Sequence, residues 1–346
     1  MTAQQLSVIV FTLFCFFGFD LKPMPICEAD PWRLQYFRRV ETAVNIPTED
    51  ADAWNWYPAH RWVYDKLAVA LSQGLDAGPH GTAPPHYPVF SKPIINLKGM
   101  GVGSRVLNSP AEYDQHYAPG HMWVTLLDGR HVSSDVAVVN GEPRWWRHVT
   151  GRPTGEGAFD YWWIHAEPDP EIEANCGKWL RERLTGYSGM LNLETIGGKI
   201  IEAHLRFADQ WPDLYGDGWI DALVQLYERH EWNFADDNRC DGYSVVLFGP
   251  NGRQYRHPPE TLVDEIKQLD SVTSVQVTFH EDWAPERHSM PPGGFRLAIV
   301  NCSELEAGKA ARARLREFFL AEIEATRQPA LSSDLVESGR PRSRDA

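Results

Sequence analysis

Polar and apolar residues follow two different periods along the chain, and together these predict a mixed α+β fold. Runs typical of strands occur at 89–97, 122–127, 131–139, 145–150, 243–248, 275–279 and 295–301. Spacing of three or four residues, typical of helices, occurs at 61–75, 171–184, 219–229, 261–269 and 304–322. Within 219–229 this spacing places a set of apolar side chains on one helix face: Ile220, Leu223, Val224 and Tyr227.

The most informative alternation lies in residues 192–207. Its second half alternates Glu202, His204 and Arg206 with apolar residues, so an acid, an imidazole and a guanidinium share one face of a strand. In its first half Asn192 and Glu194 also share a face. A Gly-Gly pair at 197–198 separates the two halves, which predicts a β-hairpin.

The length of the hairpin loop decides whether the two polar faces coincide. A three-residue loop at 197–199 places Glu194 opposite Glu202 and Asn192 opposite His204. A two-residue turn places the acids on opposite faces, because a slip of one residue reverses a strand. Facing carboxylates repel each other unless a cation lies between them. The residues alone are equally compatible with a surface strand that carries scattered charges.

Composition narrows the class of protein. The 346 residues suffice for two or three compact units, and 43% hydrophobic with 23% charged residues is typical of a soluble globular protein. A net charge of −14 disfavours nucleic acid as a partner. The cysteines form no Cys-x-x-Cys motif, so we expect reduced thiols and a cytoplasmic location; they are Cys15, Cys27, Cys176, Cys240 and Cys302.

The two ends of the chain differ from the rest. Residues 7–19 are apolar and uncharged, but no basic residue precedes them and no Ala-x-Ala site follows. We favour a buried strand or a misplaced start codon over a signal or anchor, and expect no membrane partner. Residues 332–346 are rich in Ser, Arg, Asp and Pro, which predicts disorder.

Several motifs in order resemble the ATP-grasp ligases. The hairpin 192–206 resembles the metal-binding hairpin of that family, and Asp65-Lys66 resembles the Asp-Lys pair whose lysine reaches the phosphates. The strand ending at Lys92-Pro93, the glycine-rich run 99–104 and the segment 123–135 follow in the family's order. The resemblance covers about residues 60–320.

The resemblance implies an α+β fold in which two α+β subdomains enclose ATP. It divides the chain into an apolar segment (1–25), a reduced N-terminal region (26–60), an ATP-grasp domain (61–236), a small C-terminal α+β cap (237–325) and a disordered tail (326–346). Family members usually begin with a complete α/β domain, so the N-terminal region is at most a remnant here.

The resemblance also assigns residues to the nucleotide. Lys66 and Lys92 would neutralise phosphates, and the glycine loop would bring backbone N–H groups to them. The full set of implied ATP-binding residues is Lys66, Lys92, Gly99, Gly101, Gly103, Ser104, Trp123 and Val124. Read as ordinary residues, Lys92 is a surface lysine and the glycines form a common turn.

The metal, catalytic and substrate assignments follow from the same hairpin. Glu194 and Glu202 offer hard oxygen ligands that suit Mg²⁺ or Mn²⁺, and His204 stands where the family usually has Asn. His204 is therefore a metal ligand, a substrate contact or a structural histidine. Arg206 would bind an acyl-phosphate or a substrate carboxylate. The residues expected to border the acceptor are Asp209, Asp213 and Tyr215, with ordinary solvated acids as the alternative.

The implied activity uses ATP and Mg²⁺ or Mn²⁺ to activate a small-molecule carboxylate as an acyl-phosphate, which an amine or other nucleophile attacks to give ADP and phosphate. A homodimer is compatible with the sequence. The short hairpin, His204 and His131 in place of the usual Glu depart from the family pattern. They motivate a second hypothesis, an ATP-binding regulatory or scaffold protein without catalysis. A third hypothesis is a membrane-tethered, aromatic-rich binding protein, which depends wholly on the N-terminal apolar run.

Overall fold

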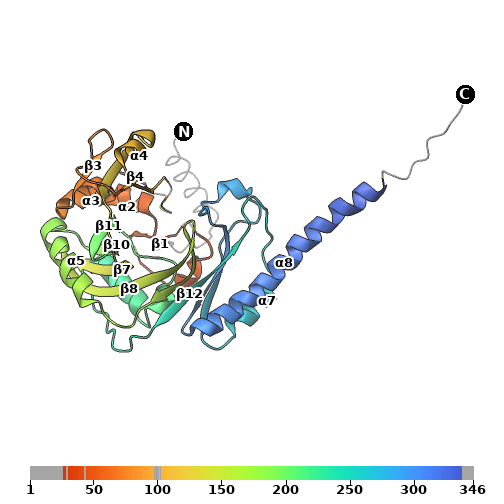
Figure 1. The fold of residues 1–346 in the computed structure, drawn as a ribbon. Helices are drawn as coiled ribbons and strands as arrows, with labels where there is room; N and C mark the ends of the chain where they lie inside the picture. Colours follow the sequence, from red (N-terminus) through yellow and green to blue (C-terminus); the bar gives the residue numbers. More distant parts are fainter. Residues whose placement is uncertain (1–25, 29, 43, 97–100, 102, 337–346) are drawn as a thin grey trace, which may run out of the picture.

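The computed structural model describes residues 26–336 except 29, 43, 97–100 and 102 (Figure 1). The apolar run 7–19, Gly99 and residues 337–346 therefore lie outside the described residues. Within the described part of the chain, no helix combines the length and the apolar character needed to cross a membrane.

Eight antiparallel strands form the central sheet, in the order β11-β10-β7-β8-β9-β12-β14-β13 (Figure 1). In chain order they are β7 (His131–Val139), β8 (Glu142–Gly155), β9 (Ala158–Ile164), β10 (Gly189–Ile196), β11 (Lys199–His204), β12 (Gly242–Gly249), β13 (Val272–Val277) and β14 (Phe295–Cys302). The strands expected in a C-terminal cap thus extend the same sheet.

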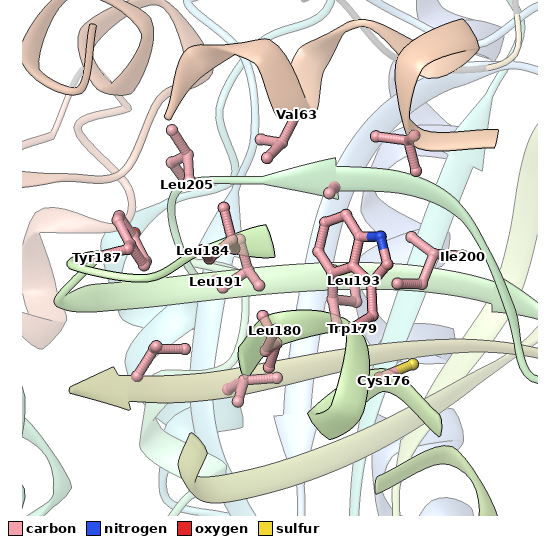
Figure 2. Close-up of a cluster of buried hydrophobic side chains, with 14 of the residues drawn as sticks. Val63, Cys176, Trp179, Leu180, Leu184, Tyr187, Leu191, Leu193, Ile200 and Leu205 are labelled. Carbon is pink, nitrogen blue, oxygen red and sulfur yellow. The ribbon is translucent and has the colours of Figure 1, made fainter. Parts of the chain in front are cut away.

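The alternation along β10 separates two faces of this sheet. Leu191 and Leu193 point into a hydrophobic cluster with Trp179 and Leu180 of α5 (Pro170–Arg183) (Figure 2). Met190 joins a second cluster on the opposite face, against α6 (Trp219–Arg229). The polar residues of β10 lie on this opposite face, beside the second cluster rather than within the first.

A smaller sheet packs beside the hairpin, with strand order β3-β6-β4-β5. Its strands are β3 (Ala77–Pro79), β4 (Val89–Pro93), β5 (Arg105–Leu107) and β6 (His121–Thr125). Helix α3 (Lys66–Ser72) packs on one face and α4 (Pro110–Gln115) on the other. We call this sheet with α3 and α4 the small lobe. Just after α3, Gln73 both donates to the carbonyl of Ile200 and accepts from its N–H, each at 2.8 Å. The small lobe therefore binds the outer edge of β11.

The N-terminal region is a short, irregular layer. Strands β1 (Ile26–Cys27) and β2 (Ile46–Pro47) pair in parallel, and η1 (Leu34–Tyr36), α2 (Asp50–Trp56) and η2 (Arg61–Tyr64) complete it. The single helix predicted over 61–75 is wrong, because the chain breaks at Asp65. The carboxylate of Asp65 accepts the N–H of Ala68 at 2.9 Å and begins α3 as its N-cap.

Two helices cover the C-terminal half of the sheet: α7 (Glu260–Lys267) and α8 (Leu305–Val336). Residues from both join a third hydrophobic cluster beneath β13 and β14. Helix α8 continues past residue 322, where the sequence pattern predicts its end, and projects beyond the sheet (Figure 1). Residues 326–336, which the sequence assigned to a disordered tail, belong to this helix. Two short 3₁₀ turns remain, η3 (Pro212–Leu214) and η4 (Pro285–Arg287).

The turn of the β10–β11 hairpin contains two residues. Ile196 pairs with Lys199, so Gly197 and Gly198 alone form the turn. Their φ angles of +55° and +74° lie in the left-handed region that a type I′ turn requires and that glycine adopts most easily. The turn is therefore the two-residue alternative, which by itself would place the two acids on opposite faces.

The predicted pairing is nevertheless confirmed. Glu194 pairs directly with Glu202, and Asn192 pairs with His204. The register shifts between positions 194 and 195, where β11 contains one extra residue, Ile201. This β-bulge restores the shared face that a two-residue turn would otherwise have reversed.

The turn gives a test of how much the hairpin contributes to stability. A Cβ on Gly197 would lie 2.4 Å from the carbonyl oxygen of Asp128, whereas one on Gly186, also at positive φ, meets nothing within 4 Å. We expect Gly197→Ala to lower the free energy of unfolding by about 1–3 kcal/mol more than Gly186→Ala, which carries only the backbone strain. Urea unfolding of both variants measures this, and equal losses would contradict it.

Candidate functional site

The polar face of the hairpin brings three of the predicted metal ligands together. One ligand atom each from Glu194, Glu202 and His204 lies within 4.8 Å of the other two. Strand pairing fixes the two carboxylates, and His204 follows Glu202 by two residues on the same face. The spacing fits a shared cation; occupation by a metal stays a prediction.

A lysine and a histidine flank the facing carboxylates. Lys66 Nζ lies 2.8 Å from Glu202 Oε1, and His131 Nε2 lies 3.2 Å from Glu194 Oε2. Burial opposes ionisation of Glu194, but the hydrogen bond from His131 and the nearby positive charges outweigh it and lower the pKa to about 2. The same hydrogen bond raises the pKa of His131. A bound cation is therefore not the only source of charge compensation at the hairpin.

The two predicted phosphate-binding lysines converge on β11. Lys66 begins α3 and Lys92 lies on β4, yet both side chains are buried, at 7% and 8% exposure. Lys92 Nζ donates to the carbonyl of Ile201, the bulge residue, at 2.7 Å. Burial and the nearby charge of Lys66 lower the pKa of Lys92 to about 8. Both amines therefore stand next to the metal-ligand candidates.

Asp50, the first residue of α2, joins the other two polar residues of the strand. Its carboxylate accepts from His204 Nδ1 at 2.9 Å, from Arg206 Nη2 at 3.3 Å and from the Tyr64 hydroxyl at 3.2 Å. Arg206 Nε lies 3.0 Å from the same carboxylate in an ion pair. Burial disfavours its charge, but Arg206 and His204 outweigh burial and hold the pKa of Asp50 well below its usual range. Asp50 is thus a buried anion held by three partners.

The contact with Asp50 orients the imidazole of His204. When Nδ1 carries the proton that Asp50 accepts, Nε2 presents its lone pair to the hairpin. Nε2 lies 3.8 Å from Glu202 Oε1, too far for a hydrogen bond. A histidine that ligates a metal commonly donates its other N–H to a carboxylate in this way. The donor set of two carboxylates and one oriented imidazole therefore fits Mg²⁺ or Mn²⁺.

The remaining ATP-binding assignments divide between the two faces of the small sheet. Lys92 pairs with Met122 on the face toward α3, which Val124 shares. Trp123 lies on the opposite face, and its indole donates to the carbonyl of Thr82 at 2.7 Å. Adjacent residues of a strand point to opposite faces, so the Trp123 side chain points away from the lysine. Any contact of Trp123 with the nucleotide would therefore have to use its backbone.

Only part of the predicted glycine loop lies in the described residues. Gly101 and Gly103 have φ angles of +60° and +81°, and Ser104 N–H donates to the carbonyl of Gly101 at 3.1 Å. This left-handed backbone is one that glycine adopts at low cost. Its contact with phosphate stays a prediction.

The three predicted acceptor residues have different environments. Asp209 forms a buried ion pair with Arg33. Asp213 accepts hydrogen bonds from Thr273 and Asn301, and the Tyr215 hydroxyl donates to the buried carboxylate of Asp135 at 2.6 Å. Internal partners engage all three residues in the folded chain. Their contact with an acceptor stays a prediction.

Sequence reasoning missed Asp50 and Tyr64. The acidic residues after Pro47 are a usual signal for the start of a helix, so the sequence contained a cue for α2 itself. Nothing local indicates that Asp50 contacts His204, because 154 positions separate the two residues.

Comparison with solved structures identifies the fold. The chain resembles phosphoribosylamine–glycine ligase from Thermotoga maritima (TM-score 0.54, 14% identity, 82% of this chain and 84% of that one). It also resembles N5-carboxyaminoimidazole ribonucleotide synthetase from Thermus thermophilus (0.53, 14%, 82% and 83%) and L-amino acid ligase from Bacillus licheniformis (0.52, 13%, 73% and 69%). No family model and no curated protein matches the sequence. The three similar structures are ATP-grasp proteins, and this chain has the ATP-grasp fold.

Asp50 contacts His204, Arg206 and Tyr64, so replacing it should lower the stability of the protein. Asp50→Asn leaves Arg206 and His204 buried beside a neutral amide, so we expect it to lower the free energy of unfolding by about 3–5 kcal/mol at pH 7. Asp52 lies in the same turn of α2, and burial raises its pKa, so its charged form is disfavoured by folding. Asp52→Asn should therefore cost nothing measurable. Urea unfolding of the two variants compares them, and similar losses would show that Asp50 is not the central partner.

Proposed function

We propose that this chain is an ATP-dependent ligase that activates a carboxylate as an acyl-phosphate for attack by an amine or another nucleophile. The observation that carries the proposal is the convergence of Lys66, Lys92, Glu194, Glu202 and His204 on one hairpin of an ATP-grasp fold. Two of the similar structures are named as ligases, an L-amino acid ligase and a phosphoribosylamine–glycine ligase.

The electrostatics of the hairpin support a phosphate chain as the ligand. ATP is highly anionic, and a carboxylate substrate adds further negative charge, so cations must surround the reacting phosphate. Lys66 and Lys92 provide two buried ammonium groups. Glu194, Glu202 and His204 would hold Mg²⁺ or Mn²⁺, which would neutralise phosphate oxygens. The imidazole favours Mn²⁺ somewhat more than the amide of the usual Asn does.

Arg206 keeps donors available for a substrate. Nε and Nη2 bind Asp50, and Nη1 donates to the carbonyl of Phe207 at 3.3 Å. A guanidinium has five N–H groups, so one hydrogen on each terminal nitrogen remains. We assign Arg206 to the acyl-phosphate or the substrate carboxylate, with Asp50 fixing the plane of the guanidinium.

A regulatory protein that binds ATP without catalysis is the less favoured function. The short hairpin and His204 are the features that motivate it. The bulge at Ile201 compensates for the short hairpin, because the acids still face each other. The contact of Asp50 with Nδ1 of His204 leaves Nε2 for the hairpin, which supports a role for His204 as a ligand.

Metal dependence tests the proposed function directly. We expect Mg²⁺ or Mn²⁺ to tighten ATP binding and Glu202→Gln to abolish that effect, because the amide lacks the anionic oxygen. The exposed Glu182→Gln serves as the control. Calorimetry with and without metal measures binding. Incubation with ATP, metal and pooled carboxylic and amino acids should release ADP in the control only. Equal metal-dependent affinity in both variants would remove the assignment.

Lys92 gives a pH-dependent prediction. Because its pKa is about 8, raising the pH through 8 removes the charge on the unliganded protein, and ATP affinity should fall. Lys92→Met should weaken ATP binding at pH 7 by about 1–3 kcal/mol through loss of a charged hydrogen bond, and should flatten the pH dependence above 8. Lys178→Met, exposed on α5, is the control. An unchanged profile in Lys92→Met would show that another group titrates.

A further inference from the structure

A second group of charged residues lies where the N-terminal region meets the sheet. Carboxylate oxygens of Glu28, Asp30 and Glu49 lie within 4.8 Å of one another. We call the following set the N-terminal charge cluster: Glu28, Asp30, Arg33, Glu49, Asp209 and Arg296. It combines residues from four separate segments of the chain.

Within the cluster, some carboxylates form an ion pair with an arginine and others form none in the described part of the chain. Arg33 pairs with Asp30 at 3.2 Å and with Asp209. Glu28 is only 8% exposed, and its one hydrogen bond is from the N–H of Asp30 to Oε1; its Oε2 is buried without a partner among the described residues. Neither Glu28 nor Glu49 has an ion pair in the described part of the chain. Two carboxylates therefore lack the cation that burial requires.

The pKa values of Glu28 and Glu49 agree with their lack of a cationic partner. Burial and the charge of Asp209 raise the pKa of Glu28 to about 8 and that of Glu49 to about 7. At pH 7 Glu28 is therefore mostly protonated and Glu49 about half protonated, and a positive group bound beside them would favour their ionised forms. The charged groups around them are Asp30, Arg33, Asp209, Arg206, Arg296 and His280.

Arg296 on β14 adds a second guanidinium to the cluster, beside that of Arg33. Its guanidinium interacts electrostatically with Asp30, Glu49 and Asp209, but it lies within ion-pair distance of no carboxylate in the described residues. Its Nε is buried and has no hydrogen-bond partner there. Burial, followed by repulsion from Arg33, lowers the pKa of Arg296 to about 10. A guanidinium held in this way is suited to bind a carboxylate in a bidentate manner.

We propose that the N-terminal charge cluster binds an amino acid, with the ammonium group on Glu28, Asp30 and Glu49 and the carboxylate on Arg296. The inference rests on the proposed function, because it assigns the amino acid as the amine substrate of the ligase. An ammonium has three N–H donors, and three acceptors at about 2.9 Å around it lie about 4.7 Å apart. The three carboxylates meet that limit.

The same residues argue against a divalent metal at the cluster. Arg33 already lies 3.2 Å from Asp30, and Arg296 faces the same acids, so a doubly charged ion would meet two neighbouring cations. A zwitterion instead pairs with both signs of charge. The cluster also adjoins the hairpin: Glu49 precedes Asp50, and Arg206 interacts with Asp50, Glu49 and Asp209.

Calorimetry on the full chain without ATP tests the proposal. The probes are the common L-amino acids and, for each binder, the matched acid lacking the amino group and the matched amine lacking the carboxylate; for phenylalanine these are 3-phenylpropionate and phenethylamine. We expect at least one amino acid to bind and both truncated probes to bind at least tenfold more weakly. Binding should release protons at pH 7, seen as a heat that depends on the ionisation enthalpy of the buffer.

The variants separate the two halves of the cluster. Glu28→Gln and Glu49→Gln should each weaken amino-acid binding at least tenfold and reduce proton release. Arg296→Met should weaken the amino acid but not the amine. Asp52→Asn is the control. Because folding raises the pKa of Glu28 and Glu49, their ionisation above pH 4.5 destabilises the fold, so the Gln variants should melt no lower than wild type at pH 7.

Two results would overturn the proposal. One is that Mn²⁺, added without ATP or amino acid, binds to the Glu202→Gln variant and that a further Glu49→Gln substitution removes this binding. That result would make the cluster a metal site. The other is the absence of any amino-acid binding in wild-type protein that still binds ATP with metal, which would leave the ligase proposal intact and remove this one. Loss of ATP binding with amino-acid binding retained would instead contradict the ligase proposal, because the amino-acid measurement does not use ATP.

Discussion

The site depends on one electrostatic constraint, the pairing of two carboxylates across adjacent strands. Glu194 and Glu202 face each other because a bulge at Ile201 corrects the register set by a two-residue turn. Like charges at this distance destabilise a sheet unless cations surround them. In the folded chain Lys66 supplies positive charge beside Glu202, and His131 forms a hydrogen bond with Glu194. The hairpin is therefore a preformed anionic site whose cationic surroundings come from other elements.

The N-terminal region contributes side chains to both charged sites of the molecule. Although only about 35 residues long, it supplies Asp50 to orient His204 and Arg206, and it supplies Glu28, Asp30 and Glu49 to the charge cluster. Its own secondary structure is slight, and its position is fixed by ion pairs and by core contacts such as those of Ile46 and Phe37. Side-chain charge thus performs a structural role that strands and helices perform elsewhere in the molecule.

The sequence predicted the elements with strong periodicity well. The bounds of β7 and α6 agree with the expectation, and the pairing of Glu194 with Glu202 is confirmed. The bulge could not be predicted, because the apolar run around Ile200 and Ile201 fits either register. Asp50 was missed because its partners are distant in sequence. The hydrogen bond of Tyr215 to Asp135 could not be predicted, because a tyrosine in a buried hydrogen bond and one at a surface have the same sequence signature.

The attachment of the small lobe to β11 has a consequence for solubility. β11 is the last strand of its sheet, and its outer backbone groups would be free to pair with another chain. Gln73 binds both backbone groups of Ile200, Lys92 binds the carbonyl of Ile201, and the Tyr64 hydroxyl accepts the N–H of Leu205. Side chains therefore occupy the places that a neighbouring strand would take. The lobe that carries the two buried lysines also protects the sheet from edge-to-edge aggregation.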